Sequence, residues 1–192
     1  DVAPSALSYN SPNVFTVGSS IVNLVPSFTG NVSSFSIAPA LPSGLSFDTT
    51  TGIISGTPNV VSSTSIYTVT ALNSGGSTSF GVSITVNDVA PSALAYASPN
   101  VFTVGSSIAD LVPSFSGNVT SFSIAPALPS GLSFDTATGI ISGTPNVVSA
   151  AAIYTVTAVN SGGSTSFGVS ITVNDVAPSA LSYNSPNVFT VG

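Results

Sequence analysis

The sequence lacks most of the side chains on which enzyme active sites depend. Its 192 residues include no Lys, Arg, His, Glu, Gln, Cys, Met or Trp, and six Asp residues give a formal net charge of −6. General acid–base catalysis near neutral pH normally uses His, Glu, Lys or Cys, and only Asp remains. No His, Lys or Cys is present to activate the many Ser and Thr hydroxyls as nucleophiles. The composition therefore predicts a protein that is not an enzyme.

The same absences exclude several kinds of partner. Without cationic side chains, the chain has no means of neutralising nucleic-acid phosphates. Without His and Cys, the usual ligands of zinc, haem and iron–sulfur clusters are missing, so no such cofactor is expected. Apolar residues make up 43% of the chain, but polar residues interrupt them every few positions. No run approaches the roughly 18–20 apolar residues of a membrane-spanning helix.

What the sequence does contain is a long internal repeat. Residues 88–174 match residues 1–87 at 76 of 87 positions, and residues 175–192 are identical to residues 1–18. A period of 87 residues is too long for a solenoid and suits one small domain per copy. The sequence therefore predicts two domains, at 1–87 and 88–174, followed by the first strands of a third copy at 175–192.

Each repeat has the residue pattern of β-strands. Phe80, Val82, Ile84 and Val86 alternate with small polar residues, which is typical of a half-buried strand. A second alternating run covers 67–71, and the turn residues at 73–76 between the two runs predict a hairpin.

Further short strands are expected within each repeat. They lie at 14–17, 20–24, 34–37, 45–47 and 53–55, and Asp48 and Gly52 form a turn between the last two. About seven strands per repeat and no helical pattern predict an all-β fold of tandem antiparallel sandwiches, stacked end to end as a semi-rigid rod.

Two segments of each repeat resemble a known family. They are LPSGLSFDTTTGIISGTP at 41–58 and IYTVTALNSGGSTSFGVSITV at 66–86, and both recur at 128–145 and 153–173. They are similar to the bacterial He_PIG domains, which are immunoglobulin- or cadherin-like. The resemblance implies sandwich domains in large secreted or surface-anchored bacterial proteins, where such repeats form stalks or adhesin arrays. It therefore implies an extracellular or cell-surface location.

The junctions between repeats are candidate calcium sites. Asn87-Asp88 and Asn174-Asp175 each begin an Asn-Asp-x-x-Pro run that resembles part of a cadherin linker. Calcium prefers six to eight oxygen ligands, usually with several carboxylates. Thr85 stands where cadherins carry a further acidic residue, and the chain has no Glu. The alternative is that these residues form a solvated turn.

Glycosylation has two sets of candidate residues. Asn31 and Asn118 begin Asn-x-Ser/Thr sequons at equivalent positions. Thr49 and Thr136 follow Asp in an Asp-Thr pattern that resembles a bacterial O-glycosylation motif. The alternative for both threonines is that Asp-Thr simply forms the hairpin turn.

The C-terminal segment is a candidate for self-association. It contains a β-prone run that includes Val188, Phe189 and Val191. Added to an open sheet edge of another copy, this run would pair its backbone and bury these side chains. Such a head-to-tail contact does not close and produces fibres. The alternative is that 175–192 belongs to a third domain in a longer chain.

Two classes of function remain. The preferred one is structural, with tandem repeats forming an extracellular filament or surface stalk whose partners are further copies of the chain. The alternative is an adhesin repeat that binds glycans or matrix, in a calcium-dependent manner if the junction sites bind the ion. Tyr9, Tyr96 and Tyr183 are the expected aromatic platforms for a sugar, unless they pack at the junctions instead.

Overall fold

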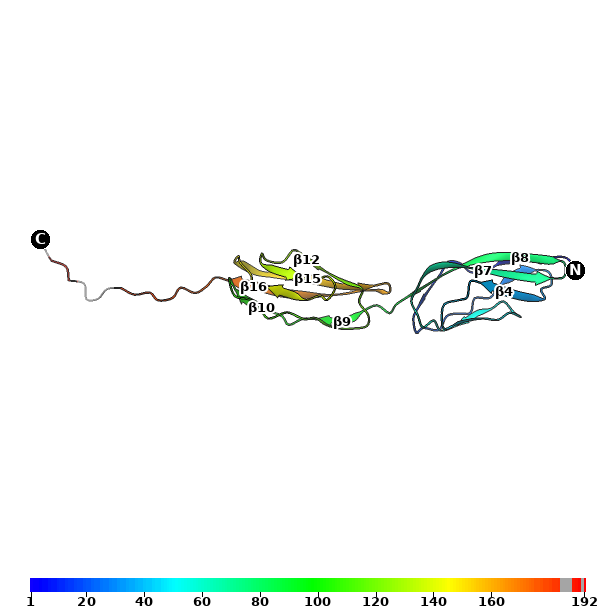
Figure 1. The fold of residues 1–192 in the computed structure, drawn as a ribbon, viewed down its shortest axis with the longest axis horizontal. Helices are drawn as coiled ribbons and strands as arrows, with labels where there is room; N and C mark the ends of the chain where they lie inside the picture. The colour runs from blue at the N-terminus through cyan, green and yellow to red at the C-terminus, as the bar shows by residue number, and fades with distance from the viewer. Residues whose placement is uncertain (184–187, 191) are drawn as a thin grey trace. The chain divides into compact units, whose positions relative to one another are not determined.

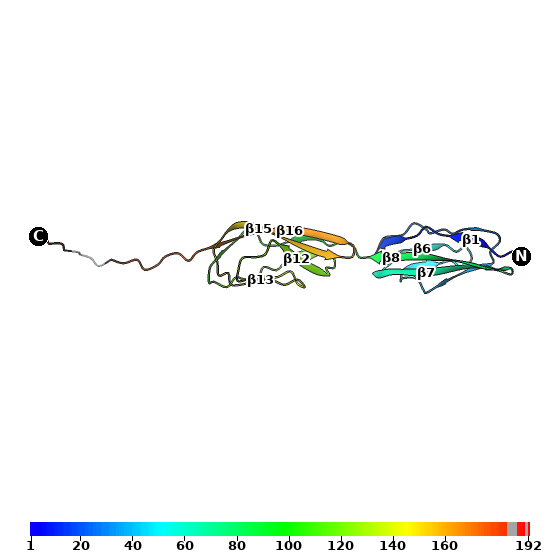
Figure 2. The same ribbon diagram turned by 90° about the horizontal axis from the view of Figure 1, so that it is seen from above.

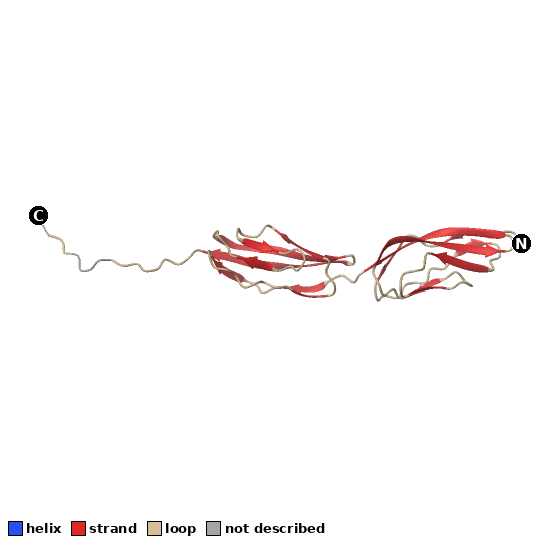
Figure 3. Cartoon of the chain, in the orientation of Figure 1, coloured by secondary structure: helices blue, strands red, loops and turns tan. Residues whose placement is uncertain are grey.

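The computed structural model describes residues 1–183, 188–190 and 192. Every helix or strand in these residues is a β-strand (Figure 3), which confirms the predicted all-β class. No helix of the described residues has the length and apolar character needed to cross a membrane. The first repeat contains β1 (Ser5–Ser8), β2 (Asn13–Thr16), β3 (Ser27–Thr29), β4 (Ser34–Ala38), β5 (Leu45–Phe47), β6 (Ile54–Gly56), β7 (Ser62–Asn73) and β8 (Gly76–Asn87). The second contains β9 (Ser92–Ala95), β10 (Asn100–Thr103), β11 (Ser114–Ser116), β12 (Ser121–Ala125), β13 (Leu132–Phe134), β14 (Ile141–Gly143), β15 (Ser149–Asn160) and β16 (Gly163–Asn174).

The strands of the first repeat form a sandwich of two layers. One layer is a four-stranded sheet in the order β2-β8-β7-β4, and Figure 1 shows β4, β7 and β8 side by side. The other layer contains the pairs β1-β3 and β5-β6, of which β1 and β6 are labelled in Figure 2. A bridge between Leu24 and Ile54 links these two pairs.

The second repeat has the same topology. Its four-stranded sheet has the order β10-β16-β15-β12, and its other layer contains β11-β9 and β13-β14. A bridge between Leu111 and Ile141 again links the two pairs. The strands of every sheet come from a single repeat, so each repeat builds its own sandwich.

The long β7-β8 hairpin carries most of the core. Asn73 lies opposite Gly76 at the turn, and the antiparallel pairing extends from there to the other end of both strands. Because successive side chains point to opposite faces, one face of each strand is buried and the other is exposed, as predicted. The buried hydrophobic residues of the first repeat are Leu7, Tyr9, Leu24, Phe35, Ile54, Tyr67, Val69, Ala71, Val82, Ile84 and Val86.

Two predictions about the strands were wrong. Residues 20–24 do not form a strand. Only Ile21 and Leu24 bond the neighbouring backbone. Their N–H groups donate to the carbonyls of Gly56 and Ile54, and the Leu24 carbonyl accepts the Ile54 N–H. Because these two residues are three apart, the strand alternation is interrupted, and Val22 between them is 87% exposed. The sandwich is also not wholly antiparallel, since β2 pairs with β8 in parallel.

The parallel pair arises because the first segment of each repeat divides between the two layers. β1 pairs with β3 in one layer, and the chain then crosses to the other layer, where β2 lies at the edge beside β8. The Ser11–Pro12 peptide bond between β1 and β2 is cis. Residues 1–18 contribute β1 to one layer and β2 to the other.

Candidate functional site

The junction aspartate is held by residues of the second repeat. The Asp88 N–H donates to the Ser161 hydroxyl at 2.9 Å. One carboxylate oxygen of Asp88 accepts the Val89 N–H at 2.8 Å, and the other accepts the Asn118 side-chain amide at 3.0 Å. These are the bonds of a turn residue that fixes a loop.

The remaining calcium candidates contribute few oxygens. The backbone carbonyls of Asn87 and Asn174 accept hydrogen bonds from Val17 and Val104, at 2.9 and 3.0 Å. Asp175 accepts the N–H of the residue that follows it, at 2.8 Å. The described residues contain no cluster of three or more His, Cys, Asp or Glu side chains. Calcium binding therefore stays a prediction, with one carboxylate at each junction.

The hairpin turn at Asp48 is organised as the sequence suggested. One carboxylate oxygen of Asp48 accepts the N–H groups of Thr50 and Thr51, at 2.8 and 3.2 Å. These bonds stabilise the ionised form and hold the pKa of Asp48 below its usual value. Gly52 closes the turn with a positive φ of 74°. Asp135 occupies the equivalent turn, and hydrogen bonds from Ala137 and Thr138 likewise lower its pKa.

The O-glycosylation candidates lie on these turns. Thr49 and Thr136 are exposed. Their backbone carbonyls accept the N–H groups of Phe35 and Phe122, both at 2.8 Å. Each threonine therefore sits on a loop whose backbone is fixed and whose side chain faces solvent. This geometry suits modification of the hydroxyl, which stays a prediction.

The two sequon asparagines are also exposed, but they differ in their side-chain contacts. The Asn118 side-chain nitrogen, to which an N-glycan would attach, donates to Asp88 at 3.0 Å. The backbone carbonyls of Asn31 and Asn118 make equivalent contacts, since they accept the side-chain amides of Asn73 and Asn160 at 2.8 and 2.9 Å. Glycosylation at Asn118 would therefore disrupt a hydrogen bond that helps fix the start of the second repeat.

A buried asparagine at the hairpin turn holds the start of each repeat, and the sequence analysis missed this role. The Asn73 side chain is 4% exposed, and its amide donates to the carbonyls of Val2 and Asn31 at 2.7 and 2.8 Å. Its side-chain oxygen accepts the Gly75 N–H at 2.8 Å. Asn160 makes the same contacts in the second repeat. The run Asn-Ser-Gly-Gly signals a turn, but nothing local to it indicates a contact 71 residues away.

Two of the three predicted sugar platforms are in the core. Tyr9 and Tyr96 are 8% and 7% exposed. Their hydroxyls donate to the carbonyls of Gly52 and Gly139, each at 2.6 Å. Burial raises the pKa of both tyrosines to about 12. The prediction was wrong for these two residues, because each tyrosine ties the first segment of its repeat to the Asp-Thr hairpin. Tyr183 is 82% exposed.

The C-terminal segment exposes the side chains proposed for strand addition. Val188 and Phe189 are 86% and 88% exposed, and Leu181 is 84% exposed. Val191 lies outside the described residues. In the identical segment at the start of the chain, the counterpart of Leu181 is Leu7, which is only 6% exposed. The same sequence is therefore packed at one end of the chain and exposed at the other.

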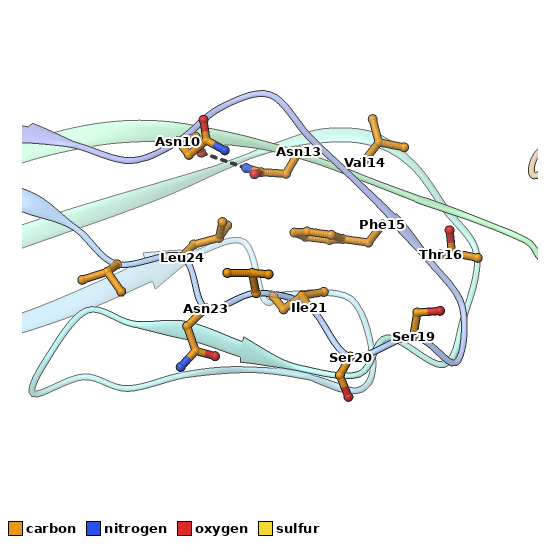
Figure 4. A pocket seen from close by; sticks show the side chains of 12 residues that line it. Asn10, Asn13, Val14, Phe15, Thr16, Ser19, Ser20, Ile21, Asn23 and Leu24 are labelled. Atoms are coloured by element: carbon orange, nitrogen blue, oxygen red, sulfur yellow. Dashed lines mark hydrogen bonds between the residues drawn. The ribbon is translucent and has the colours of Figure 1, made fainter.

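A cavity of about 650 Å³ lies beside β2 in the first repeat. Figure 4 shows the Phe15 ring pointing from β2 toward Ile21 and Leu24. The lining is mainly apolar, and the side-chain amide of Asn13 closes part of it by donating to the Asn10 carbonyl at 2.8 Å. No titratable side chain lines this cavity, so its geometry offers hydrophobic contact and no acid–base chemistry.

Comparison with known proteins identifies both repeats. The model of the family He_PIG, described as "Putative Ig domain", matches residues 2–87 and 89–174. The "Serine-rich adhesin for platelets" of Staphylococcus aureus strain MRSA252 is 32% identical over 157 residues, which is 79% of this chain and 11% of the adhesin. The adhesin of strain USA300 is also 32% identical, over 7% of its length. The chain thus spans about a tenth or less of these relatives.

Solved structures of tandem immunoglobulin domains share the fold. Extracellular domains 3–5 of Drosophila OTK align with a TM-score of 0.54 at 15% identity, covering 88% of this chain and 62% of that one. Titin domains A168–A170 align with a TM-score of 0.52 at 20% identity, covering 92% and 68% of the two chains. At these identities the similarity shows the fold alone.

Proposed function

Because the chain belongs to the He_PIG family of immunoglobulin-like domains, we propose that it is part of an extracellular bacterial stalk or filament. The single observation that carries this proposal is that the two repeats are joined directly, and that the residues on both sides of the junction are hydrogen-bonded to their own repeats. Asn87 ends the last strand of the first repeat, and its carbonyl accepts the Val17 N–H. The next residue, Asp88, is already bonded to Ser161 of the second repeat. The two repeats therefore follow one another without intervening residues, and a stalk of tandem domains would be built from such direct connections.

The outer face of the four-stranded sheet is consistent with a passive structural surface. Hydroxyl-bearing residues lie opposite one another across its strands, and Ser36 pairs with Thr70, which pairs with Ser79. The last two side chains hydrogen-bond at 2.9 Å, as do their counterparts in the second repeat. The same face also exposes the apolar side chains of Val14, Ile66 and Leu72, and neither repeat carries a cation. This surface suits a repeated spacer with no chemistry of its own.

The stalk proposal is tested by the distance between equivalent points of the two repeats. Because the chain has no Cys, spin labels are introduced cleanly at Ala40→Cys and Ala127→Cys, both exposed loop positions. A 12-residue strand spans about 40 Å, so a narrow distribution near that distance is expected. The matched control inserts six Gly/Ser residues between Asn87 and Asp88. If the native chain shows a distribution as broad as the control, the stalk proposal fails.

We also propose self-assembly through the C-terminal segment. Its exposed apolar side chains include Phe189, and the edge strands of the first repeat carry no charged side chain that would block pairing. Sedimentation of the chain as a function of concentration tests this. Assembly that Phe189→Asp abolishes supports the proposal, whereas a chain that stays monomeric at millimolar concentration refutes it.

A second candidate is an adhesin repeat that binds glycans or matrix, as the name of the S. aureus relatives suggests for those proteins. Tyr183 is the exposed aromatic residue that would serve as a sugar platform. Glycan-array binding that is lost in Tyr183→Ala, measured with and without calcium, would favour this function over the stalk. Tyr183→Phe is the control, because it keeps the ring that would stack on a sugar.

A further inference from the structure

The outer face of each four-stranded sheet exposes aliphatic side chains at matching positions. In the first repeat this outer face consists of the side chains of β2, β4, β7 and β8 that point away from the core. Ile66 on β7 and its counterpart Ile153 on β15 are both 65% exposed. Val14 on β2 and Val101 on β10 form a second such pair, at 64% and 65%. Aliphatic groups that recur on one face form a surface that can bury them against a partner.

Ile66 projects beside a row of small residues. Thr68 lies opposite Gly81 on β8 and opposite Ala38 on β4. A Cβ on Gly81 would come within 3.0 Å of the Ile66 Cγ2 atom, so the isoleucine leans over the glycine. The equivalent glycine of the second repeat has the same neighbour. Small residues around one projecting side chain allow a second sheet to approach and pack against it.

Hydroxyl groups of the outer face already have partners within the sheet. Thr64 and Thr85 hydrogen-bond at 2.7 Å, and Thr70 and Ser79 at 2.9 Å. Burial of a polar group is costly mainly when the group loses its hydrogen bonds. Because these hydroxyls bond one another, they keep their bonds when the face is covered, while the aliphatic side chains gain by leaving water.

The charge distribution favours a second copy of the chain as the partner. No charged residue lies on any strand of the two four-stranded sheets. In the first repeat the acidic residues are Asp1, which precedes β1, and Asp48, which lies in the turn between β5 and β6 of the other layer. Although each chain has a net charge of −6, two outer faces can meet without placing like charges opposite each other. A charged partner would find no complementary group there.

The outer face also approaches the size of a stable interface. β7 and β8 are 12 residues long, and β2 and β4 lie beside them. With a rise of about 3.3 Å per residue and a width of about 5 Å per strand, the four strands cover roughly 500 Å². Small stable interfaces bury about 600 Å² per partner. One outer face therefore suits a weak dimer, and the chain carries the face twice.

We propose that the outer face pairs with the outer face of a second copy, so that two chains associate side by side through their four-stranded sheets. The contact is isologous, because each copy contributes the same residues, and it closes when two faces have met. It goes beyond the stalk proposed above, which concerns how repeats follow one another along one chain. It also makes no use of the C-terminal segment. Pairing of this kind joins neighbouring stalks laterally.

Analytical ultracentrifugation of a full-length parent variant tests the pairing. The parent carries Phe189→Asp, which removes the assembly proposed for the C-terminal segment. It also carries Ile153→Asp, so that only the first repeat keeps an unchanged outer face. We expect this parent to form a closed dimer of twice 18.8 kDa at millimolar concentration.

Two matched variants of the parent identify the contact. Adding Ile66→Asp should leave only monomer, because it places like charges opposite each other in the contact. Adding Val25→Asp instead should leave the dimer unchanged. Val25 is 59% exposed, which is close to the exposure of Ile66, but it follows Leu24, which bridges Ile54 in the other layer. Far-ultraviolet circular dichroism checks that both variants keep the fold of the parent.

Methyl nuclear magnetic resonance locates the contact without a further substitution. In the parent, the methyl signals of Ile66 and Val14 should shift as the concentration rises and the dimer forms. The methyl signals of Val22 and Val25 should stay constant, because these exposed residues lie off the outer face.

Three results would overturn the pairing of outer faces. A parent that stays monomeric at millimolar concentration would show that the face has no affinity for itself. A dimer that survives Ile66→Asp, or that Val25→Asp disrupts equally, would place the contact elsewhere. Methyl shifts at Val25 in place of Ile66 would do the same. The stalk proposal is tested separately, because the distance between Ala40 and Ala127 is measured within one chain.

Discussion

Removing one hydroxyl from the core tests whether Tyr9 holds the first segment to its repeat. In Tyr9→Phe, the Gly52 carbonyl loses the donor that now lies 2.6 Å away in a buried site. Leaving a buried carbonyl without its partner costs about 1–3 kcal/mol. With a urea m-value of about 1–2 kcal/mol per molar for a small domain, the unfolding midpoint of the first repeat should fall by roughly 0.5–3 M.

The pH dependence of this effect has a definite sign. Burial raises the pKa of Tyr9 to about 12, from an ordinary value of 10.0. The protonated hydroxyl therefore contributes stability that is fully present below pH 10 and is lost as the pH rises through 12. Tyr9→Phe cannot ionise, so the stability gap between wild type and variant should narrow between pH 10 and 12. Allowing for partial solvent screening, the narrowing is on the order of 1 kcal/mol.

Urea unfolding followed by far-ultraviolet circular dichroism measures both effects. Tyr96→Phe should shift the second repeat in the same way, since its hydroxyl makes the equivalent bond at 2.6 Å. Tyr183→Phe is the control and should leave the midpoint unchanged, because that residue is 82% exposed. An unchanged midpoint in Tyr9→Phe, or a stability gap that does not depend on pH, would refute the reasoning.

Three further changes test the turns of the first repeat, each by its effect on the urea midpoint. A Cβ on Gly75 would overlap the backbone oxygen of Asp1, so Gly75→Ala should cost about 1–3 kcal/mol, while Gly192→Ala, with open space around it, should cost nothing. Asn73→Ala removes the two hydrogen bonds that hold the start of the repeat and should lower the free energy of unfolding by about 2–4 kcal/mol. An unchanged urea midpoint would contradict this role of Asn73. Asp48→Ala should destabilise more at pH 7 than below the lowered pKa of Asp48, because the ionised carboxylate accepts the N–H groups of the turn more strongly than the protonated acid does.

The strands that carry the core were predictable because their pattern is local. Alternation over 80–86 requires only that a strand has two faces, and the structure buries Val82, Ile84 and Val86 completely. The turn at Asp48 was predictable for the same reason, since its hydrogen bonds reach two and three residues along the chain. The failure at 20–24 has a local cause as well. Only Ile21 and Leu24 of that segment hydrogen-bond to the backbone of β6. The residue pattern alone does not show where such backbone pairing stops.

The residues that define the candidate sites depend on contacts that no local pattern encodes. Tyr9 and Gly52 are 43 residues apart, and Asn73 and Val2 are 71 apart. The sequence around a tyrosine near a junction fits an exposed sugar-binding residue and a core residue equally well. Only the position of its hydrogen-bond partner, here the Gly52 carbonyl, distinguishes the two. The parallel pairing of β2 was hidden similarly, because a four-residue strand has the same composition in either direction.

The two repeats also provide a natural experiment on what holds a sandwich together. In the first repeat, the hydroxyls of Thr64 and Thr85 hydrogen-bond at 2.7 Å across β7 and β8. In the second repeat Ala151 replaces Thr64, yet β15 has the same 12-residue length as β7. The outward hydroxyl pair is therefore dispensable for pairing, while the inward residues Val156, Val169 and Ile171 remain fully buried. A second outward pair, Thr70 and Ser79, keeps its 2.9 Å hydrogen bond in the second repeat as Thr157 and Ser166, so the comparison shows that the Thr64–Thr85 pair in particular is not needed for the sheet to form.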